Sequence, residues 1–363
     1  MKLLHLSDLH LGKRLYGVSM LHEQREMLDQ ILTAAEHVDA VLIAGDVYDK
    51  LIPPTEAVRL FDWFLTELAA RQIPVLLISG NHDSAERLAF GAALFERGGV
   101  HLSPVYDGSV QRVTLRDAYG DVDFYLLPFL KPALVRPYHP EVTDYPSAIA
   151  AALAGLPLEP SCRNVLLAHQ FVAGCAPSES EERMVGGLDE IPAQLFSAFD
   201  YVALGHLHQA QAAGAAHIRY CGSPLQYSFS EAAKTLTLVE LGQKGTISIR
   251  EQPLTSGHPL RTLRGKFEKL MAEDATEDYL RVILTDELEL PDAAARLRSL
   301  YPNLLRMEYD NTRTRSQQTL ELHTAAEELS PAEIVDGFYR LQNGRAMDGE
   351  QAAYLNRLLE EWT

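Results

Sequence analysis

Apolar runs that end in polar residues alternate with helical patterns along the N-terminal part of the chain. Short runs at 3–7, 40–45 and 74–80 read as buried strands, and helical periodicity predicts helices near 21–36, 54–72 and 84–97. Within 54–72 the apolar residues recur on one helical face, behind a Pro-Pro-Thr-Glu start. This βαβαβ order predicts a parallel or mixed sheet that binds ligands beyond the carboxyl ends of its strands.

A second set of strand-like runs follows at 113–115, 124–129, 217–224 and 235–241. We expect them to form a second layer, which gives the predicted α/β fold, a two-sheet αββα sandwich. The stretch LTSGHPLR at 254–261 indicates a linker, and a small β-α-β pattern and two capped amphipathic helices follow it. The predicted domains are a main domain at 1–260, an α+β cap at 261–326 and C-terminal helices at 327–363.

Length and composition set the broad class of protein. With 363 residues, of which 47% are hydrophobic, the chain can form a large core plus an appendage. No apolar stretch reaches the roughly 20 residues of a membrane span, and the start MKLLHLSDLHL lacks the unbroken apolar region of a signal peptide. We therefore expect a cytoplasmic protein with no membrane association. The three irregularly spaced cysteines fit free thiols in a reducing compartment.

The charge balance bears on nucleic-acid binding. A net charge of −18 argues against a free-standing nucleic-acid binder, because phosphate contacts usually require a basic excess. The objection weakens if divalent ions neutralise acidic residues at a site and a partner supplies affinity for DNA. Basic clusters at 261–266 and 311–315 fit DNA contacts and solvated surface equally well, and both interpretations stay open.

Polar residues follow five strand-like runs, in HLSDLH, LIAGDVYD, LISGNHD, VLLAHQ and YVALGHLH. Because each follows a strand at its carboxyl end, we expect these residues to meet at one edge of the fold. Carboxylates, imidazoles and one amide without a thiolate suit manganese, iron or zinc, and the ligands suffice for two ions. Two cations about 3.5–4 Å apart suit phosphoester hydrolysis. The pooled residues are Asp8, His10, Asp46, Asp49, Asn81, His82, Asp83, His169, His206 and His208.

Each of these motifs alone also has a structural interpretation. An Asp-x-His triplet occurs by chance, and Asp46 with Asp49 could cap the helix that follows them. For Asp83 we favour this interpretation and expect it to cap the helix at 84–97. The pair His206 and His208 is more specific, because alternate residues of an extended segment point the same way. Their joint occurrence after successive strands favours a metal site.

At this point the sequence resembles a known family. The stretches SDLH (7–10), GDVYD (45–49) and GNHD (80–83), His169 and GHLH (205–208) are similar to the five motifs of the calcineurin-like metallophosphoesterases. Within that superfamily, GDVYDKLIPP (45–54), FDYVALGHLH (199–208) and YCGSPLQYSFSE (220–231) resemble the SbcD family, the nuclease subunits of bacterial SbcCD complexes. The resemblance covers most of the chain.

The resemblance implies a role for each site residue. It puts Asp8, His10 and His208 on one metal, Asn81, His169 and His206 on the other, and Asp46 between the two metals. It makes His82 the catalytic histidine that binds no metal, and Asp49, often histidine in the eukaryotic and archaeal counterparts, becomes the expected partner of His82. A second departure is Cys221, where the family pattern has proline.

The resemblance also implies a function. It predicts a nuclease with two Mn²⁺ ions, or Mg²⁺ or other divalent ions, that acts on DNA as a 3′ to 5′ double-strand exonuclease and as an endonuclease on single strands and hairpins. The predicted partners are an SbcC-like, SMC-like ATPase bound through the C-terminal helices and a second copy bound through 54–72 and 84–97, for work in DNA replication, recombination and repair. The alternatives are a stand-alone metallophosphatase or phosphodiesterase and, less favoured because every ligand position is filled, a non-catalytic assembly protein. Lys50 and Asp83 stand where a protein phosphatase would have arginine and glutamate.

Overall fold

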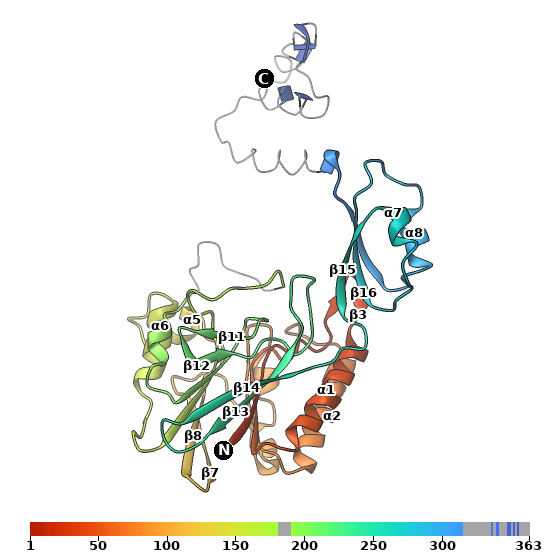
Figure 1. Ribbon diagram of the computed structural model, residues 1–363. Helices are drawn as coiled ribbons and strands as arrows, with labels where there is room; N and C mark the ends of the chain where they lie inside the picture. The colour runs from red at the N-terminus through yellow and green to blue at the C-terminus, as the bar shows by residue number, and fades with distance from the viewer. Residues whose placement is uncertain are drawn as a thin grey trace. The chain divides into compact units, whose positions relative to one another are not determined.

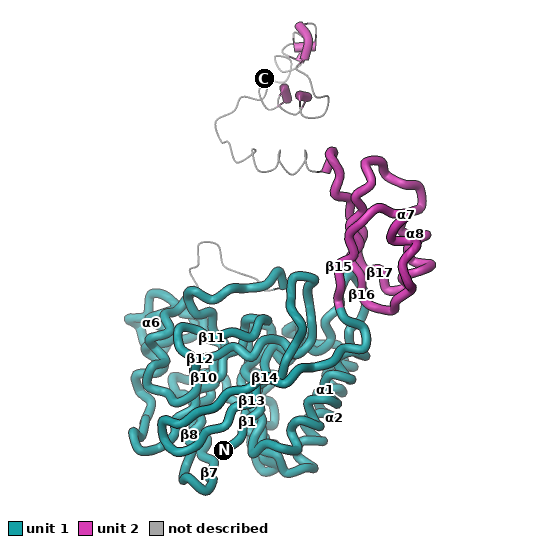
Figure 2. Tube along the Cα trace, viewed as in Figure 1, with its two compact units in different colours: residues 1–259 teal, residues 260–363 magenta. Residues whose placement is uncertain are grey.

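The chain forms two compact units, Met1–Pro259 and Leu260–Thr363, coloured separately in Figure 2. The computed structural model describes residues 1–180 and 190–314, together with 335–336, 339–340, 347–349, 351–352 and 354–355. Most of the predicted C-terminal helices, and the predicted boundary at 326, therefore lie outside the described residues. No helix among the described residues is long and apolar enough to cross a membrane.

The first unit contains two six-stranded sheets (Figure 1). In the first sheet the order is β14-β13-β1-β4-β5-β6, and β1, β4, β5 and β6 are parallel. The strands are β1 (Lys2–Leu6), β4 (Ala40–Ala44), β5 (Val75–Ile78), β6 (Val100–Leu102), β13 (Thr235–Leu241) and β14 (Ile247–Pro253). The expectation that 235–241 lies in the second layer is wrong, because β13 pairs antiparallel with β1, with Leu3 opposite Val239.

The second sheet has the order β11-β12-β10-β9-β8-β7. Its strands β8, β9, β10 and β12 are parallel to one another, and β7 and β11 pair antiparallel at the two edges. The strands are β7 (Gln111–Asp117), β8 (Gly120–Leu126), β9 (Arg163–His169), β10 (Tyr201–Gly205), β11 (Gln211–Ala213) and β12 (Ala215–Tyr220). The carboxyl ends of the central strands are therefore available to build a site in this sheet too.

Three apolar layers hold this unit together. The layer between the sheets joins Leu3 and Leu42 of the first sheet to Phe124 and Leu167 of the second, all fully buried. On the outer face of the first sheet pack α1 (Leu21–Ala35) and α2 (Thr55–Ala70), and on that of the second packs α6 (Tyr145–Ala154). Apolar residues fill both faces of the central strands, as strands covered on both sides require. The predicted αββα sandwich is confirmed.

The segment after β5 differs from the single helix expected at 84–97. It consists of α3 (Ala85–Leu88), α4 (Ala92–Phe95) and a 3₁₀ turn, Glu96–Gly98. Gly91 lies between the two short helices with φ of 75°, a left-handed conformation that ends a right-handed helix and that glycine adopts without steric cost. Among the described residues of this unit, the remaining short elements are β2 (Arg14–Leu15), β3 (Val18–Ser19), α5 (Pro132–Val135) and a 3₁₀ turn, Ala193–Phe196.

The second unit, as far as it is described, is a three-stranded parallel sheet in the order β15-β16-β17. The elements are β15 (Leu260–Gly265), α7 (Phe267–Leu270), β16 (Tyr279–Leu284), α8 (Ala293–Arg298) and β17 (Leu304–Tyr309). Leu280 and Val282 pack with Leu297 and Tyr301 in its core. The predicted β-α-β pattern corresponds to β16, α8 and β17. Strand β15 was not predicted, because its exposed arginines resemble a basic surface cluster.

Candidate metal centre

The side chains pooled from the sequence come together where the two sheets meet. Asp8 and His10 follow β1, Asp46 and Asp49 follow β4, and Asn81 with His82 follows β5. From the second sheet, His169 is the last residue of β9, and His206 with His208 follows β10. Hydrogen bonds join the two groups, since His169 Nδ1 donates to the Ala44 carbonyl oxygen at 2.7 Å. Asp8 and His206, for example, are 198 positions apart in sequence and share a hydrogen bond.

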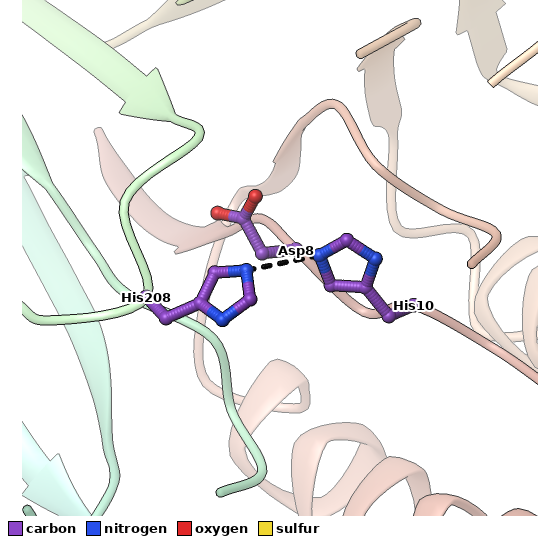
Figure 3. Close-up of side chains that lie close together, drawn as sticks. All are labelled: Asp8, His10 and His208. Atoms are coloured by element: carbon purple, nitrogen blue, oxygen red, sulfur yellow. Dashed lines mark hydrogen bonds between the residues drawn. The ribbon is translucent and has the colours of Figure 1, made fainter. Parts of the chain in front are cut away.

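Asp8, His10 and His208 form the first group of potential ligands (Figure 3). One ligand atom of each residue lies within 4.8 Å of the others, and all three residues are buried. The Nε2 atoms of His10 and His208 are 3.0 Å apart. Both Asp8 oxygens accept from the backbone N–H of His206, at 3.1 Å each, which fixes the carboxylate. This group has the nitrogen and oxygen donors that a transition-metal dication binds.

Asn81, His169 and His206 form the second group. Asn81 Oδ1 lies 3.0 Å from His169 Nε2 and 3.1 Å from His206 Nδ1. The Ala44 carbonyl accepts the Nδ1 proton of His169, so a neutral His169 presents the lone pair of Nε2. Two acceptor atoms 3.0 Å apart attract one another only through a proton or a cation between them. A metal ion fits this place.

The Asp46 carboxylate lies between the two groups. Its Oδ2 is 3.7 Å from His10 Nε2 and 3.4 Å from His169 Nε2. Its Oδ1 accepts from the backbone N–H of His82 at 2.9 Å, which leaves Oδ2 facing the histidines. A carboxylate in this position can bridge two cations.

The charges of the cluster fit metal binding. Burial lowers the pKa of His10 well below its ordinary value, and burial together with His169 lowers the pKa of His206 to about 3, so both imidazoles are neutral. Burial raises the pKa of Asp8 and opposes ionisation of Asp46, but the contacts of Asp46 with His169 lower the pKa of Asp46. For His169, burial is outweighed by the Asp46 carboxylate, which raises the pKa of His169 to about 9, so a metal ion bound at its Nε2 would displace a proton. Neutral histidines and a carboxylate are the protonation states in which these side chains bind metals.

Four candidate ligands have a left-handed backbone. The φ angles are 53° at Asp8, 43° at His10, 51° at Asp46 and 106° at His206. Such conformations cost non-glycine residues on the order of 1–3 kcal/mol each and cluster at functional sites. Backbone hydrogen bonds hold the first two strand ends together, from Asp8 N to Gly45 O and from His10 N to Asp46 O, both 3.0 Å. The left-handed conformations turn the chain sharply at the strand ends, so that these side chains point toward the same site.

Two glycines allow the close approach of the strand ends. A Cβ on Gly80 would overlap the Asp46 carboxylate, and a Cβ on Gly205 would overlap the Ala44 carbonyl oxygen. Only glycine therefore fits at these positions, and the reason is the space and not the φ angle.

Asp83 does not cap the following helix, contrary to the expectation from sequence. Its carboxylate accepts three backbone N–H groups, from Gly80 at 2.9 Å, Tyr48 at 3.0 Å and Val47 at 3.1 Å, and Ser84 caps α3 instead. Burial and the charge of Asp46 raise the pKa of Asp83 to about 6. Asp83 thus ties the loop after β4 to the loop after β5.

The expected pair of the Asp49 carboxylate with His82 is wrong. The Asp49 carboxylate accepts from Lys13 Nζ at 2.7 Å, and Nδ1 of the neutral His10 lies 3.9 Å away. His82 Nδ1 lies 3.0 Å from the backbone carbonyl oxygen of Asp49. A ligand atom of His82 also lies within 4.8 Å of ligand atoms of His10 and Asp46, so geometry alone would let His82 bind a metal.

Comparison with known proteins agrees with this geometry. The family model described as "Calcineurin-like phosphoesterase" matches residues 1–210, which contain all the candidate metal ligands. The chain belongs to the calcineurin-like phosphoesterase family. The fold of this family implies divalent metal ions, and the described clusters of histidine and aspartate can hold them.

Relatives within the phosphoesterase family extend the match to the whole chain. A protein named as the SbcD subunit of the nuclease SbcCD, from Staphylococcus saprophyticus subsp. saprophyticus, is 30% identical over 99% of this chain and 98% of its own length. The protein of the same name from Staphylococcus epidermidis is 28% identical over 99% of this chain and 98% of its length. Residues 256–343 match the family model described as "Type 5 capsule protein repressor C-terminal domain", named SbcD_C. The resemblance to the SbcD family is confirmed.

Several residues that support this phosphoesterase site were missed by the sequence analysis. Ser7 Oγ donates to Asp8 Oδ2 at 2.5 Å and lies 3.0 Å from Cys221 Sγ, so the unusual cysteine packs beneath a candidate ligand. The ring of Tyr227 packs against His10 and His208, with centroids 5.6 and 6.0 Å apart. Apart from the position of Cys221, no spacing or residue type in the sequence indicated these contacts.

Proposed function

We propose that the protein is a nuclease that hydrolyses phosphodiester bonds of DNA with two divalent metal ions. The observation that carries the proposal is the pair of ligand groups on either side of Asp46, whose Oδ2 lies within 3.7 Å of a histidine nitrogen from each group. The relatives that match the chain over its full length are named as nuclease subunits, which favours DNA over other phosphoesters.

The two ligand groups would hold one ion each. In this proposal Asp8, His10 and His208 bind the first ion and Asn81, His169 and His206 bind the second, with Asp46 between them. Histidine-rich sites with carboxylates suit manganese better than magnesium, which prefers oxygen ligands. When bound, the two cations orient the phosphate and stabilise the charge on the attacking and leaving oxygens.

His82 would act on the leaving group. The backbone carbonyl of Asp49 can only accept, so Nδ1 of His82 carries a proton in both protonation states. Nε2 is therefore the atom that can give a proton to the departing sugar oxygen and take one from water afterwards. His82 is half-buried, which leaves its ring accessible to a substrate.

A stand-alone phosphatase on the same fold would use the same ligands, so the test must compare substrates. We expect the purified protein with Mn²⁺ to shorten 3′-labelled and 5′-labelled duplexes from the 3′ end and to cut single strands and hairpins, with slow turnover of p-nitrophenyl phosphate. Asp46→Asn should lose this activity, whereas Asp121→Asn, on an exposed ion pair far from the cluster in sequence, should retain it. Rapid phosphomonoester hydrolysis with intact DNA would contradict the proposal.

We also propose an ATPase partner of the SbcC kind, because the relatives are named as subunits of the SbcCD nuclease. The predicted docking helices at 327–363 lie largely outside the described residues. Deleting 327–363 should abolish co-purification with the ATPase and spare the Mn²⁺-dependent cutting of single strands. A truncated protein that still binds the ATPase would contradict this assignment.

The basic clusters at 261–266 and 311–315 are less suited to DNA binding than their arginine content alone indicates. Arg261 pairs with Asp278 at 2.5 Å, Arg264 pairs with Asp310, and Arg313 pairs with Glu289 at 3.2 Å. Paired arginines release less energy on binding phosphate, because they first lose the carboxylate. These contacts favour a solvated surface for both clusters, and a direct role in DNA binding becomes the weaker proposal.

We propose a homodimer through the surface formed by α2 and the segment 85–98. Large apolar side chains are exposed there: Phe90 is 83% exposed and Leu94 72%, close to half-exposed Val58 and Phe95. Phe90, Val58 and Phe95 help to line a hollow of about 340 Å³, whose other lining residues are mainly apolar. Clustered exposed apolar residues mark interaction sites, and a second copy would cover them.

A further inference from the structure

His208 has a hydrogen-bonded chain on the side of its ring that faces away from the first ligand group. Its Nδ1 lies 2.7 Å from Ser180 Oγ, and Ser180 Oγ donates to Glu231 Oε1 at 2.5 Å. Nδ1 of His208 and Oε1 of Glu231 are themselves 3.4 Å apart. Neither Ser180 nor Glu231 is among the candidate metal ligands named above.

The chain of bonds determines which nitrogen of His208 carries the proton. An ionised carboxylate can only accept, so the single hydroxyl proton of Ser180 goes to Glu231. The Ser180 oxygen then accepts, and His208 Nδ1 must donate. Nε2 is left with its lone pair, and this is the atom 3.0 Å from Nε2 of His10.

Glu231 is itself fixed in place. Its side chain is fully buried, and Oε2 accepts from Lys234 Nζ at 2.6 Å and from the Tyr227 backbone N–H at 3.1 Å. Lys234 Nζ also donates to the backbone carbonyl of His208 at 2.7 Å. The lysine therefore neutralises the buried carboxylate, which would be costly to bury alone, and attaches it to the backbone of the same histidine.

We propose that Glu231 is a positioning residue for His208: acting through Ser180, it fixes the Nδ1 proton and aims Nε2 at the site formed with Asp8 and His10. A carboxylate behind a ligating histidine fixes both the tautomer and the ring orientation, and its loss typically reduces metal affinity or activity roughly 10- to 100-fold. The proposal rests on the metal site of the proposed function, and the choice of DNA as substrate does not affect it.

The test measures metal binding directly on the full-length chain. In Glu231→Gln and Ser180→Ala, titration calorimetry with Mn²⁺ should give one ion bound roughly 10- to 100-fold more weakly and the other with unchanged affinity. Turnover should recover when Mn²⁺ is raised in proportion. Glu251→Gln is the matched control, because Glu251 also pairs with a basic residue, Arg219, and its described hydrogen bonds go to Arg219 and Thr235.

A double variant that carries both Glu231→Gln and Ser180→Ala shows whether the two residues act on His208 in series or independently. If Glu231 acts through Ser180, the double variant should bind Mn²⁺ no more weakly than the weaker-binding single variant, because one connection is broken in each case. Losses that add, or wild-type affinity at both sites in Glu231→Gln, would overturn the proposal. A melting temperature lowered in EDTA with unchanged Mn²⁺ affinity would assign Glu231 a structural role only, and would also overturn it.

The titration is independent of the nuclease assay. Failure of the wild-type protein to cut DNA would count against the proposed function and would leave the Mn²⁺ affinities to decide the role of Glu231. Ser180 is half-buried in a loop, so Ser180→Ala tests the same relay even if Glu231→Gln does not fold.

Discussion

Nδ1 of His82 lies 3.0 Å from the backbone carbonyl oxygen of Asp49, while the Asp49 carboxylate turns away to Lys13 at 2.7 Å. The orientation of His82 therefore depends on the main chain at residue 49 and not on the side chain. A carbonyl at this position can be supplied by any residue. This relationship separates the roles of two side chains that the sequence had predicted to act together.

We expect His82→Gln to lower turnover by roughly a hundredfold or more, the range for loss of a general acid. Two Mn²⁺ ions should stay bound and DNA affinity should stay near that of the wild type, because the proposed ligands are unchanged. Metal analysis by mass spectrometry and single-turnover kinetics measure the two effects. Loss of one ion in His82→Gln would make His82 a ligand, as its distance to His10 and Asp46 permits.

Asp49→Asn should leave the pH dependence of turnover unchanged, because the backbone carbonyl still accepts from His82. Turnover should fall by less than about tenfold, because the asparagine can still accept a hydrogen bond from Lys13 and none of the proposed metal ligands changes. Lys13→Met should lower turnover by a similar factor if the ion pair between Lys13 and Asp49 is what matters for turnover. A changed pH profile in Asp49→Asn would restore the carboxylate as the partner of His82.

Removing metal should destabilise the first unit, because Asp8 and Asp46 lie buried together. When the Mn²⁺ concentration is a hundredfold above the dissociation constant, binding raises the free energy of unfolding by about 2.7 kcal/mol and the melting temperature by roughly 5–10 °C. Scanning calorimetry in EDTA and in Mn²⁺ measures it. Asp46→Asn should show a much smaller shift, and equal melting temperatures for the wild type in both buffers would argue against metal binding.

Asp117→Asn should lower the free energy of unfolding by about 2 kcal/mol at pH 7, because buried Arg163 donates two hydrogen bonds to this carboxylate, at 2.5 and 2.9 Å. The same bonds hold the pKa of Asp117 well below its ordinary value. The folded state therefore keeps Asp117 ionised where the unfolded chain, with a pKa of about 3.9, is protonated. The stabilisation is complete above about pH 4 and is lost as the pH falls further.

Urea unfolding between pH 7 and pH 2 tests this dependence. The difference between the wild type and Asp117→Asn should shrink below pH 4, whereas Asp121→Asn, paired with the exposed Arg116, should show little difference at any pH. A difference that stays constant down to pH 2 would remove ionisation of Asp117 as the cause.

Phe90→Ser should convert the proposed dimer to a monomer, because it removes the most exposed aromatic ring of the apolar surface. Light scattering at micromolar concentration should then report the chain mass of 40.3 kDa instead of twice that value. The control is Tyr119→Ser, a similarly exposed aromatic residue (59%) at the turn between β7 and β8. A wild-type protein that is monomeric with and without DNA would contradict the homodimer.

The βαβαβ alternation of the N-terminal part and the convergence of the polar residues could be predicted from the sequence because both follow local rules. Each motif ends an apolar run, and the carboxyl ends of parallel strands meet at one edge. The structure brings all these side chains together, and their individual roles stay predictions. Asp8 and His206 illustrate this, since their contact joins residues from both sheets.

The failures of prediction have a common physical origin in contacts between distant segments. Nothing local to 235–241 distinguishes a strand of one sheet from a strand of the other, so β13 was misplaced. Asp83 precedes a helix and looked like a cap, but its burial lets it accept three backbone N–H groups from two loops. Glu231 contacts His208 through Ser180, and no sequence spacing encodes such a relay.

The pairing of β1 with both β4 and β13 has a consequence for synthesis of the chain. β1, which leads into Asp8 and His10, stays an open edge on one side until residue 241 has left the ribosome, and His208 also arrives late. Long-range pairings of this kind form slowly and after local structure. Because Asp8 and His10 are made first and His208 and β13 much later, the site cannot be complete until about two thirds of the chain, up to residue 241, has been synthesised.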